Sequence, residues 1–217
     1  PGLNDAALAP IIERAFKRGK PKAVALAINS PGGSPVQSAL IAARIRRLAE
    51  DKNIKVYAFC EDVAASGGYW LASTADEIYI DGNSIVGSIG VISASFGFDE
   101  FIERQGIERR VYTAGEDKSM LDPFRPVKEA DVERVKSLQK VIHTNFIEQV
   151  TSRRGTKVGE QDLYTGEVWV GAQAVENGLV DGIGHLFPTM KKLFGDDVRL
   201  PVHGQKRSLL SRFGAAS

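Results

Sequence analysis

Ser66 stands where an apolar, strand-like run over residues 56–60 gives way to a helical pattern that continues to residue 72. Two glycines, Gly67 and Gly68, follow it directly. A serine in such a strand-to-helix turn can expose its hydroxyl as a nucleophile, and the glycines let backbone N–H groups approach a ligand. The stretch reads Ala-x-Ser-x-Gly rather than Gly-x-Ser-x-Gly, and small residues also serve close packing. From this stretch alone, a nucleophile and a plain turn serine are both open.

A serine nucleophile needs a base, because its free hydroxyl reacts poorly at neutral pH. The histidines are His143, His185 and His203, and a lone histidine inside a packed helical pattern, such as His143, is more often structural. The sequence therefore offers no clear candidate for the histidine of a Ser-His-Asp triad. A lysine can accept the proton instead where burial disfavours its charged form. Lys118, in a loop over residues 115–124, is such a candidate, with a solvated lysine beside acidic neighbours as the alternative.

A second glycine turn, Asn29-Ser-Pro-Gly-Gly33, follows an apolar run over residues 23–28. Its backbone N–H groups stay unpaired unless another group accepts from them. Ser34 and Pro35 come next, and they predict a helix start with the Ser34 hydroxyl as N-cap. Both glycine turns thus lie between a strand-like run and a helix.

The elements around these turns alternate between strand and helix patterns. We expect helices over residues 6–18, 36–51, 99–105, 129–154, 171–178 and 186–194, and strands over residues 23–28, 56–60, 77–80, 89–96 and 107–113. Such alternation predicts an α/β fold with a mostly parallel sheet, in which binding groups gather at the carboxyl ends of the strands.

Composition limits the classes of protein. The 217 residues are 43% hydrophobic and 25% charged, which favours one globular domain, over residues 1–203, with a basic and flexible tail over residues 204–217. A net charge of +1 gives no reason to expect a nucleic acid partner. The single cysteine, Cys60, excludes an internal disulfide. No cluster of His, Cys and carboxylate residues has the spacing of metal ligands, so we expect neither a metal nor a cofactor.

The longest uncharged stretch, residues 82–98, is too short and too rich in Gly and Ser to span a bilayer. We therefore expect a soluble chain. Because it begins at Pro1, it is also expected to be part of a longer protein whose membrane anchor could precede it.

Five motifs, in order and spacing, resemble the signal peptide peptidase A family, the SppA/SohB-type serine peptidases of class S49. The resemblance runs from about residue 24 to about residue 184. The motifs are Asn29-Ser-Pro-Gly-Gly33, Ala65-Ser-Gly-Gly-Tyr69, Val86-Gly-Ser-Ile-Gly-Val91, Lys118-Ser-Met-Leu-Asp-Pro-Phe124, and Gly166-Glu-Val-Trp-Val-Gly-Ala172 with Asn177-Gly-Leu-Val-Asp181.

The resemblance implies a ClpP/crotonase-type α/β fold and a Ser-Lys dyad. The family's nucleophile falls on Ser66 and its general base on Lys118, 52 positions later (118 − 66 = 52). The serine that orients the lysine amine falls on Ser88. The two N–H groups of the oxyanion hole fall on Gly33 and Gly67. The implied function is a serine endopeptidase that hydrolyses peptide bonds through an acyl-enzyme.

The resemblance also implies partners and a location. The expected substrates are signal-peptide remnants or other membrane-derived peptides, and the expected assembly is a homo-oligomeric ring or dome. The peptidase domain would be associated with the bacterial inner membrane, facing the periplasm or the exterior, through a segment that this chain lacks. Family members usually carry a further strand before the first helix, and its absence leaves the edge of the sheet in question.

Three alternatives stay open. A Clp-type protease would need a histidine soon after the serine, but the next one is His143. A crotonase-type acyl-CoA enzyme would use glutamates near its thioester, which suits the two glycine turns less well than peptide hydrolysis does. A non-catalytic scaffold of the same fold has no physical need for either Ser66 or Lys118.

Overall fold

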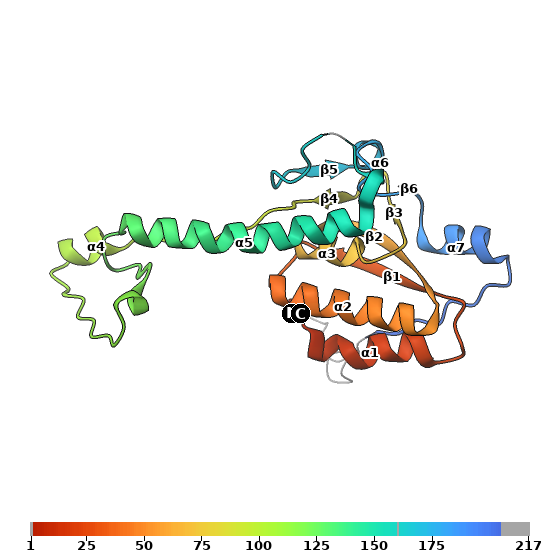
Figure 1. Ribbon diagram of the computed structural model, residues 1–217, viewed down its shortest axis with the longest axis horizontal. Coiled ribbons are helices and arrows are strands. Elements are labelled where there is room, and N and C mark those ends of the chain that lie inside the picture. Colours follow the sequence, from red (N-terminus) through yellow and green to blue (C-terminus); the bar gives the residue numbers. More distant parts are fainter. Residues whose placement is uncertain (1, 160, 205–217) are drawn as a thin grey trace, which may run out of the picture. The chain divides into compact units, whose positions relative to one another are not determined.

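The computed structural model describes residues 2–159 and 161–204, and these form two compact units (Figure 1). The first unit contains the chain up to Ile89 and again from Phe146 onward, and the second contains residues 90–145. A single domain over residues 1–203 stays a prediction. Residues 205–217 of the predicted tail lie outside the described residues.

The sheet belongs to the first unit and is mostly parallel. Its strands, within the described residues, are β1 (Ala23–Ser30), β2 (Lys55–Ala65), β3 (Glu77–Ile80), β4 (Ile85–Gly87), β5 (Val168–Val170) and β6 (Gly182–Ile183). They are ordered β5-β4-β2-β3-β6, and β1 also pairs with β2. Only the pair β4 and β5 is antiparallel. The predicted α/β class with a mostly parallel sheet is confirmed.

Strand β2 is the centre of this sheet, because it pairs with β1, β3 and β4. Its apolar run is buried on both faces of the sheet. Val56, Ala58 and Cys60 pack into the main core, which also contains residues of α2 (Pro35–Lys52) and β3. The alternate residues Tyr57 and Phe59 pack on the other face against α7 (Leu186–Phe194). Continuous apolar runs are typical of parallel strands covered on both sides. Burial of the Cys60 thiol raises its pKa to about 12, so it is an inert core residue.

The helices of the first unit lie close to the predicted positions. Helix α1 (Asp5–Lys17) begins at Asn4, whose side chain accepts a hydrogen bond from the N–H of Ala7. It packs beside α2 (Figure 1), and Arg44 of α2 makes two hydrogen bonds of 2.7 and 2.8 Å to Asp5. The short helices α3 (Gly67–Ala72) and α6 (Ala172–Glu176) each follow a strand. Helix α2 begins as predicted, with Ser34 at the N-cap position and Pro35 first, but the predicted capping by the Ser34 hydroxyl is wrong, since this hydroxyl makes no capping hydrogen bond.

The second unit contains α4 (Asp99–Arg104), a 3-10 turn (Glu116–Ser119) and the first turns of α5 (Glu129–Arg154). The strands predicted over residues 89–96 and 107–113 are wrong, because neither segment has regular structure. A strand needs a partner for its backbone groups, and residues 90–145 contain no strand with which either segment could pair.

The sequence also leaves three strands unpredicted. Strands β4, β5 and β6 are only two or three residues long, so they carry no alternation that a pattern can reveal. Their positions depend on tertiary pairing with β2 and β3.

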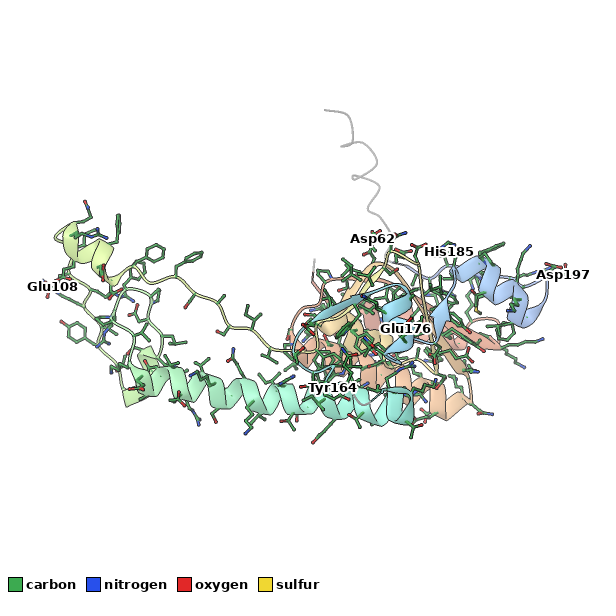
Figure 2. All side chains as sticks on the ribbon, turned by 90° about the horizontal axis from the view of Figure 1, so that it is seen from above. Asp62, Glu108, Tyr164, Glu176, His185 and Asp197 are labelled. Carbon is green, nitrogen blue, oxygen red and sulfur yellow. The ribbon has the colours of Figure 1, made fainter. Side chains whose placement is uncertain are left out.

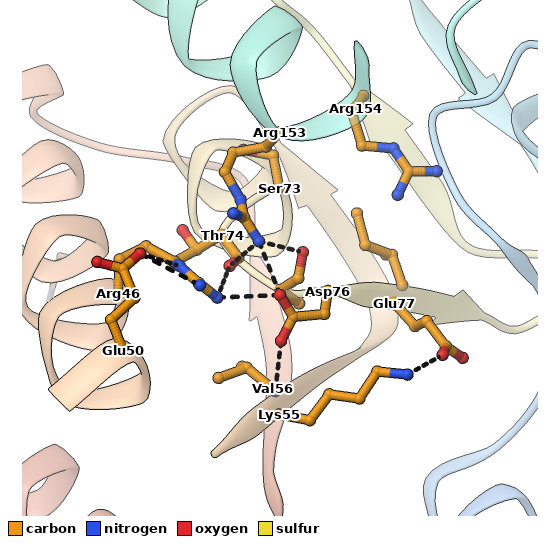
Figure 3. A network of polar contacts seen from close by, with 12 residues as sticks. Arg46, Glu50, Lys55, Val56, Ser73, Thr74, Asp76, Glu77, Arg153 and Arg154 are labelled. Carbon is orange, nitrogen blue, oxygen red and sulfur yellow. Dashed lines mark hydrogen bonds and ion pairs between the residues drawn. The ribbon is translucent and has the colours of Figure 1, made fainter. Parts of the chain in front are cut away.

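The last turns of α5, from Phe146 onward, belong to the first unit, and polar contacts fix them to the rest of it. The hydroxyl of Thr151 lies 3.2 Å from that of Tyr164, which is labelled in Figure 2. Arg153 and Arg46 both bind Asp76 Oδ1, at 3.0 and 3.1 Å, while Asp76 Oδ2 accepts a hydrogen bond from the Val56 N–H (Figure 3). One carboxylate thus joins α5, α2 and the beginning of β2.

Arg154 makes the most buried of the ion pairs among the described residues. Its side chain is 1% exposed, and it binds Asp181 at 2.8 Å and the carbonyl of Gly178 at 2.7 and 3.0 Å. Asp181 also accepts hydrogen bonds from Lys157 and from the Ile78 N–H. Burial alone would raise the pKa of Asp181, but the bonds from Arg154 and Lys157 outweigh it and hold this pKa below its ordinary value.

We predict that Asp181→Asn lowers the free energy of unfolding by about 3–5 kcal/mol, because it leaves the buried Arg154 guanidinium without its counter-charge. Urea denaturation followed by circular dichroism measures this. The matched control is Lys157→Gln, which removes the half-exposed partner of the same carboxylate and should cost less than about 1 kcal/mol.

The same pair predicts the pH dependence. Because the pKa of Asp181 is lower in the folded than in the unfolded chain, its stabilisation is present above the ordinary pKa of 3.8 and is lost as pH falls through the folded-state value. The difference in stability between wild type and Asp181→Asn should therefore shrink below about pH 3.8. A difference that stays constant down to pH 2 would contradict this ion pair.

Candidate active site

Ser66 lies in a strained backbone conformation between β2 and α3. Its dihedral angles are φ 51° and ψ −123°, a region that residues other than glycine rarely adopt. Its N–H donates to the carbonyl of Gly87 at 2.8 Å, and its carbonyl accepts from the Trp70 N–H at 3.0 Å. The turn from β5 into α6 has almost the same angles, φ 50° and ψ −121°, but there the residue is Gly171. At Ser66 the chain keeps a side chain despite the strain.

The two glycine turns press directly against each other. A Cβ added to Gly32 would lie 2.8 Å from the Cβ of Ser66 and 3.0 Å from the nitrogen of Gly67. A Cβ added to Gly67 would lie 3.2 Å from the nitrogen of Gly33 and would overlap the hydroxyl oxygen of Ser38. The turn that contains Gly32 and Gly33 therefore lies in direct contact with Ser66 and Gly67.

Gly68 completes this contact one residue later. A Cβ there would overlap the carbonyl oxygen of Ser30, the last residue of β1. The hydroxyl of Ser30 in turn accepts a hydrogen bond from the N–H of Gly32 at 3.2 Å. The ends of β1 and β2 can approach so closely because glycines stand at these three positions, 32, 67 and 68.

Ser88 lies at the end of the strand next to Ser66. Ala65 of β2 pairs with Gly87 of β4, so Ser66 and Ser88 take the next position on two parallel strands, which lie about 4.8 Å apart. Ser88 has a positive φ of 52°, and its N–H donates to the carbonyl of Glu167 at 2.6 Å. The sequence analysis assigned no role to Gly32 or Gly87. Each directly precedes a predicted site residue, Gly33 or Ser88, and this position in the sequence could have indicated that they contribute to the site.

Lys118 lies in the second unit, in the 3-10 turn, and is exposed. Its N–H donates to the carbonyl of Gly115 at 3.3 Å. The loop that follows is held by Asp122, whose carboxylate accepts from the Phe124 N–H and from Arg109. The structure thus brings Gly33, Ser66, Gly67 and Ser88 together in the first unit, while the pairing of Ser66 with Lys118 stays a prediction.

His185, one of the three histidines in the sequence, is paired with Asp81. Its Nε2 lies 2.7 Å from Asp81 Oδ2, in the loop after β3. His185 immediately precedes α7 and is labelled in Figure 2. The hydrogen bonds with His185 and then with Asn83 lower the pKa of Asp81 to about 2. This pair holds α7 beside the sheet and gives no support to a histidine base.

Two further properties bear on the class of site. Within residues 2–159 and 161–204, no group of three or more His, Cys, Asp or Glu residues is placed to hold a metal ion. None of the helices in the same ranges is long and apolar enough to cross a membrane.

Comparison with known families bears on the alternatives that the sequence left open. Residues 48–194, which include Ser66, Ser88 and Lys118, match the model of peptidase family S49. The chain belongs to peptidase family S49. Membership of this family favours an S49-type peptidase over a Clp-type protease and over a crotonase-type acyl-CoA enzyme.

Some relatives of this chain are named as proteases, and others are named as Na(+)/H(+) antiporters. Serine protease SPPA of Arabidopsis thaliana is 33% identical over 77% of this chain and 25% of its own length. Protease 4 of Haemophilus influenzae is 33% identical over 85% of this chain and 30% of its own. A Brucella melitensis protein named Na(+)/H(+) antiporter NhaA is 52% identical over 98% of this chain but only 29% of its own length. The chain thus spans less than a third of these relatives, and the antiporter name describes a much longer protein.

We predict that Gly68→Ala lowers the free energy of unfolding by about 1–3 kcal/mol, because the new methyl group overlaps a backbone carbonyl that cannot rotate away. Thermal and urea denaturation measure this. The control is Gly82→Ala, where a Cβ meets nothing within 4 Å. Equal stabilities of the two variants would show that the turns are not in contact as described.

Proposed function

We propose that this chain is the catalytic domain of a serine endopeptidase that uses Ser66 as nucleophile and Lys118 as general base. The observation that carries the proposal is the strained turn at Ser66, against which the Gly32-Gly33 turn packs. Strain of this kind persists at functional sites because the surrounding structure over-determines it. Membership of family S49 supports the same chemistry.

The oxyanion hole of the proposed site consists of the N–H groups of Gly33 and Gly67. Gly67 is the first residue of α3, and N–H groups in a first helical turn have no partner within the helix. The nitrogen of Gly33 lies beside it, in the turn that precedes α2. Two such donors would stabilise the negative oxygen of a tetrahedral intermediate, an effect worth about 2.7–4 kcal/mol per donor.

In the proposed reaction the amine of Lys118, once it has lost its own proton, takes the proton from the Ser66 hydroxyl as the Ser66 oxygen attacks the peptide carbonyl. The C–N bond then breaks, and the lysine returns the proton to the leaving amine. Water, deprotonated by the same lysine, then attacks the acyl carbon, the C–O bond to Ser66 breaks, and the lysine returns the proton to the Ser66 oxygen. Ser88 would accept a hydrogen bond that orients the amine, because it stands at the strand end next to Ser66.

The proposed substrates are signal-peptide remnants and other membrane-derived peptides. The support is family membership, since relatives include a protein named SPPA. We further propose that the whole protein is associated with the bacterial inner membrane through a segment outside this chain, with the peptidase domain facing the periplasm or the exterior.

The second unit supports a proposal of self-assembly into a ring or dome. It exposes large apolar side chains to an unusual degree, with Ile92 87%, Phe96 79% and Tyr112 91% exposed, and Phe101 beside them in α4 55% exposed. Monomeric proteins rarely leave so much apolar surface in contact with water. Its strand-like segments 89–96 and 107–113 also lack partner strands, which another copy could provide.

We predict that Ser66→Ala and Lys118→Ala each lower kcat for a fluorogenic peptide with a small or apolar residue before the scissile bond by about 10³-fold or more. The controls are Ser34→Ala, a nearby exposed serine, and Lys128→Ala, an exposed lysine of the second unit. Both controls should retain wild-type kcat. Full activity in either dyad variant would overturn the dyad.

For the assembly, we predict that the double substitution Phe96→Ser and Phe101→Ser shifts the protein toward monomer in sedimentation velocity. The control, Val202→Ser, removes an equally exposed apolar side chain of the first unit and should leave the sedimentation coefficient unchanged. A wild type that sediments as a monomer would refute the assembly.

A further inference from the structure

Ser38 is a fully buried polar residue in the first turns of α2, directly after the Gly33 turn. Its hydroxyl donates to the carbonyl of Ser34 at 3.1 Å, and its own N–H donates to the same carbonyl at 3.0 Å. The residues around it on the inner face of the helix, Ile41, Ala42 and Ile45, are apolar. Ser38 is therefore a single hydroxyl at the end of an otherwise apolar stripe.

The hydroxyl oxygen of Ser38 faces the backbone of Gly67. A Cβ added to Gly67 would overlap this oxygen, so a Cα–H of Gly67 points at it. The hydroxyl proton is directed to the Ser34 carbonyl, which leaves the lone pairs of the oxygen to face Gly67. Contacts between Cα–H groups and oxygen are weak individually, but they fix the position of a backbone.

Packing alone does not explain a serine here. Alanine has nearly the same size, a better helix propensity and no hydroxyl whose burial costs free energy. The hydroxyl is useful where the orientation of its neighbour matters. That neighbour, Gly67, provides one of the two donors of the proposed oxyanion hole, and the helix that contains Ser38 begins immediately after the other, Gly33.

We propose that Ser38 is a positioning residue for the oxyanion hole, which holds the Gly67 N–H at a fixed orientation to that of Gly33. The inference rests on the proposed function, because it assigns Ser38 to that reaction. It names a residue outside the dyad and outside the five motifs that resemble the family. Its loss should misplace a donor without removing one, and a misplacement of about 1 Å can cost about 10²-fold in rate.

The test compares kcat and KM of Ser38→Ala with those of wild type on the fluorogenic peptide. We expect kcat to fall about tenfold to a hundredfold with KM within about twofold, because the donors act on the transition state. Affinity for a peptide aldehyde, whose adduct with the nucleophile places an oxyanion in the hole, should fall in parallel. If Ser38 had a purely structural role, Ser38→Ala would lower the melting temperature without a selective fall in kcat at unchanged KM.

The matched control is Ser73→Ala. Ser73 is equally buried and its hydroxyl also bonds a nearby backbone carbonyl, that of Trp70, but it lies at the far end of α3. Its kcat should equal that of wild type. If Ser38→Ala fails to fold, Ser38→Cys replaces it, since it keeps a side chain of the same connectivity but with a poor hydrogen-bonding group.

Two results would overturn the inference, and they differ from failure of the proposed function. Wild-type kcat in Ser38→Ala, or an equal loss in Ser73→Ala, would refute the role of Ser38 while cleavage still depended on Ser66. A wild type whose cleavage does not depend on Ser66 would refute the proposed function, and with it this role.

Discussion

The close approach of two backbone turns is the constraint on which the site depends. Strands β1 and β2 end side by side, and the glycines at positions 32, 67 and 68 in the turns that follow them leave no room for a Cβ. This contact sets the separation of the Gly33 and Gly67 nitrogens, and it holds Ser66 in a conformation that a free chain would avoid. Pre-organised donors of this kind need no rearrangement when charge develops.

The rest of the first unit fixes this contact from behind. The Tyr69 hydroxyl donates to the carbonyl of Leu179 at 2.7 Å inside the core, and Trp70 stacks on Phe146 with ring centroids 4.8 Å apart. Both aromatic residues belong to α3, so the helix that begins at Gly67 cannot shift along its axis. Helix α5 brings Phe146, and its last turn is itself held by Arg153 and Arg154.

Sequence patterns predicted the parts of this arrangement that depend on local chemistry. The apolar run of β2, the glycine turns and the long helix α5 each have a signal in the local sequence. Helix α5 has the predicted bounds, whereas β2 continues to Ala65, beyond the predicted end of the strand at residue 60. The positions of Ser66 and Ser88 at adjacent strand ends could not be predicted from local patterns, because β4 is three residues long and is defined by its pairing with β2. Residues 107–113 show the converse, since a strand pattern without a partner strand forms no strand.

The most direct test of the account is the site of labelling by a fluorophosphonate, which reacts with an activated serine and not with an ordinary one. Wild-type protein is treated with the probe, digested, and mapped by mass spectrometry. The account predicts a single adduct on Ser66, and none when Ser66 is replaced by alanine. An adduct on another serine, or no adduct on a protein that cleaves peptides, would contradict the assignment of Ser66 as the nucleophile.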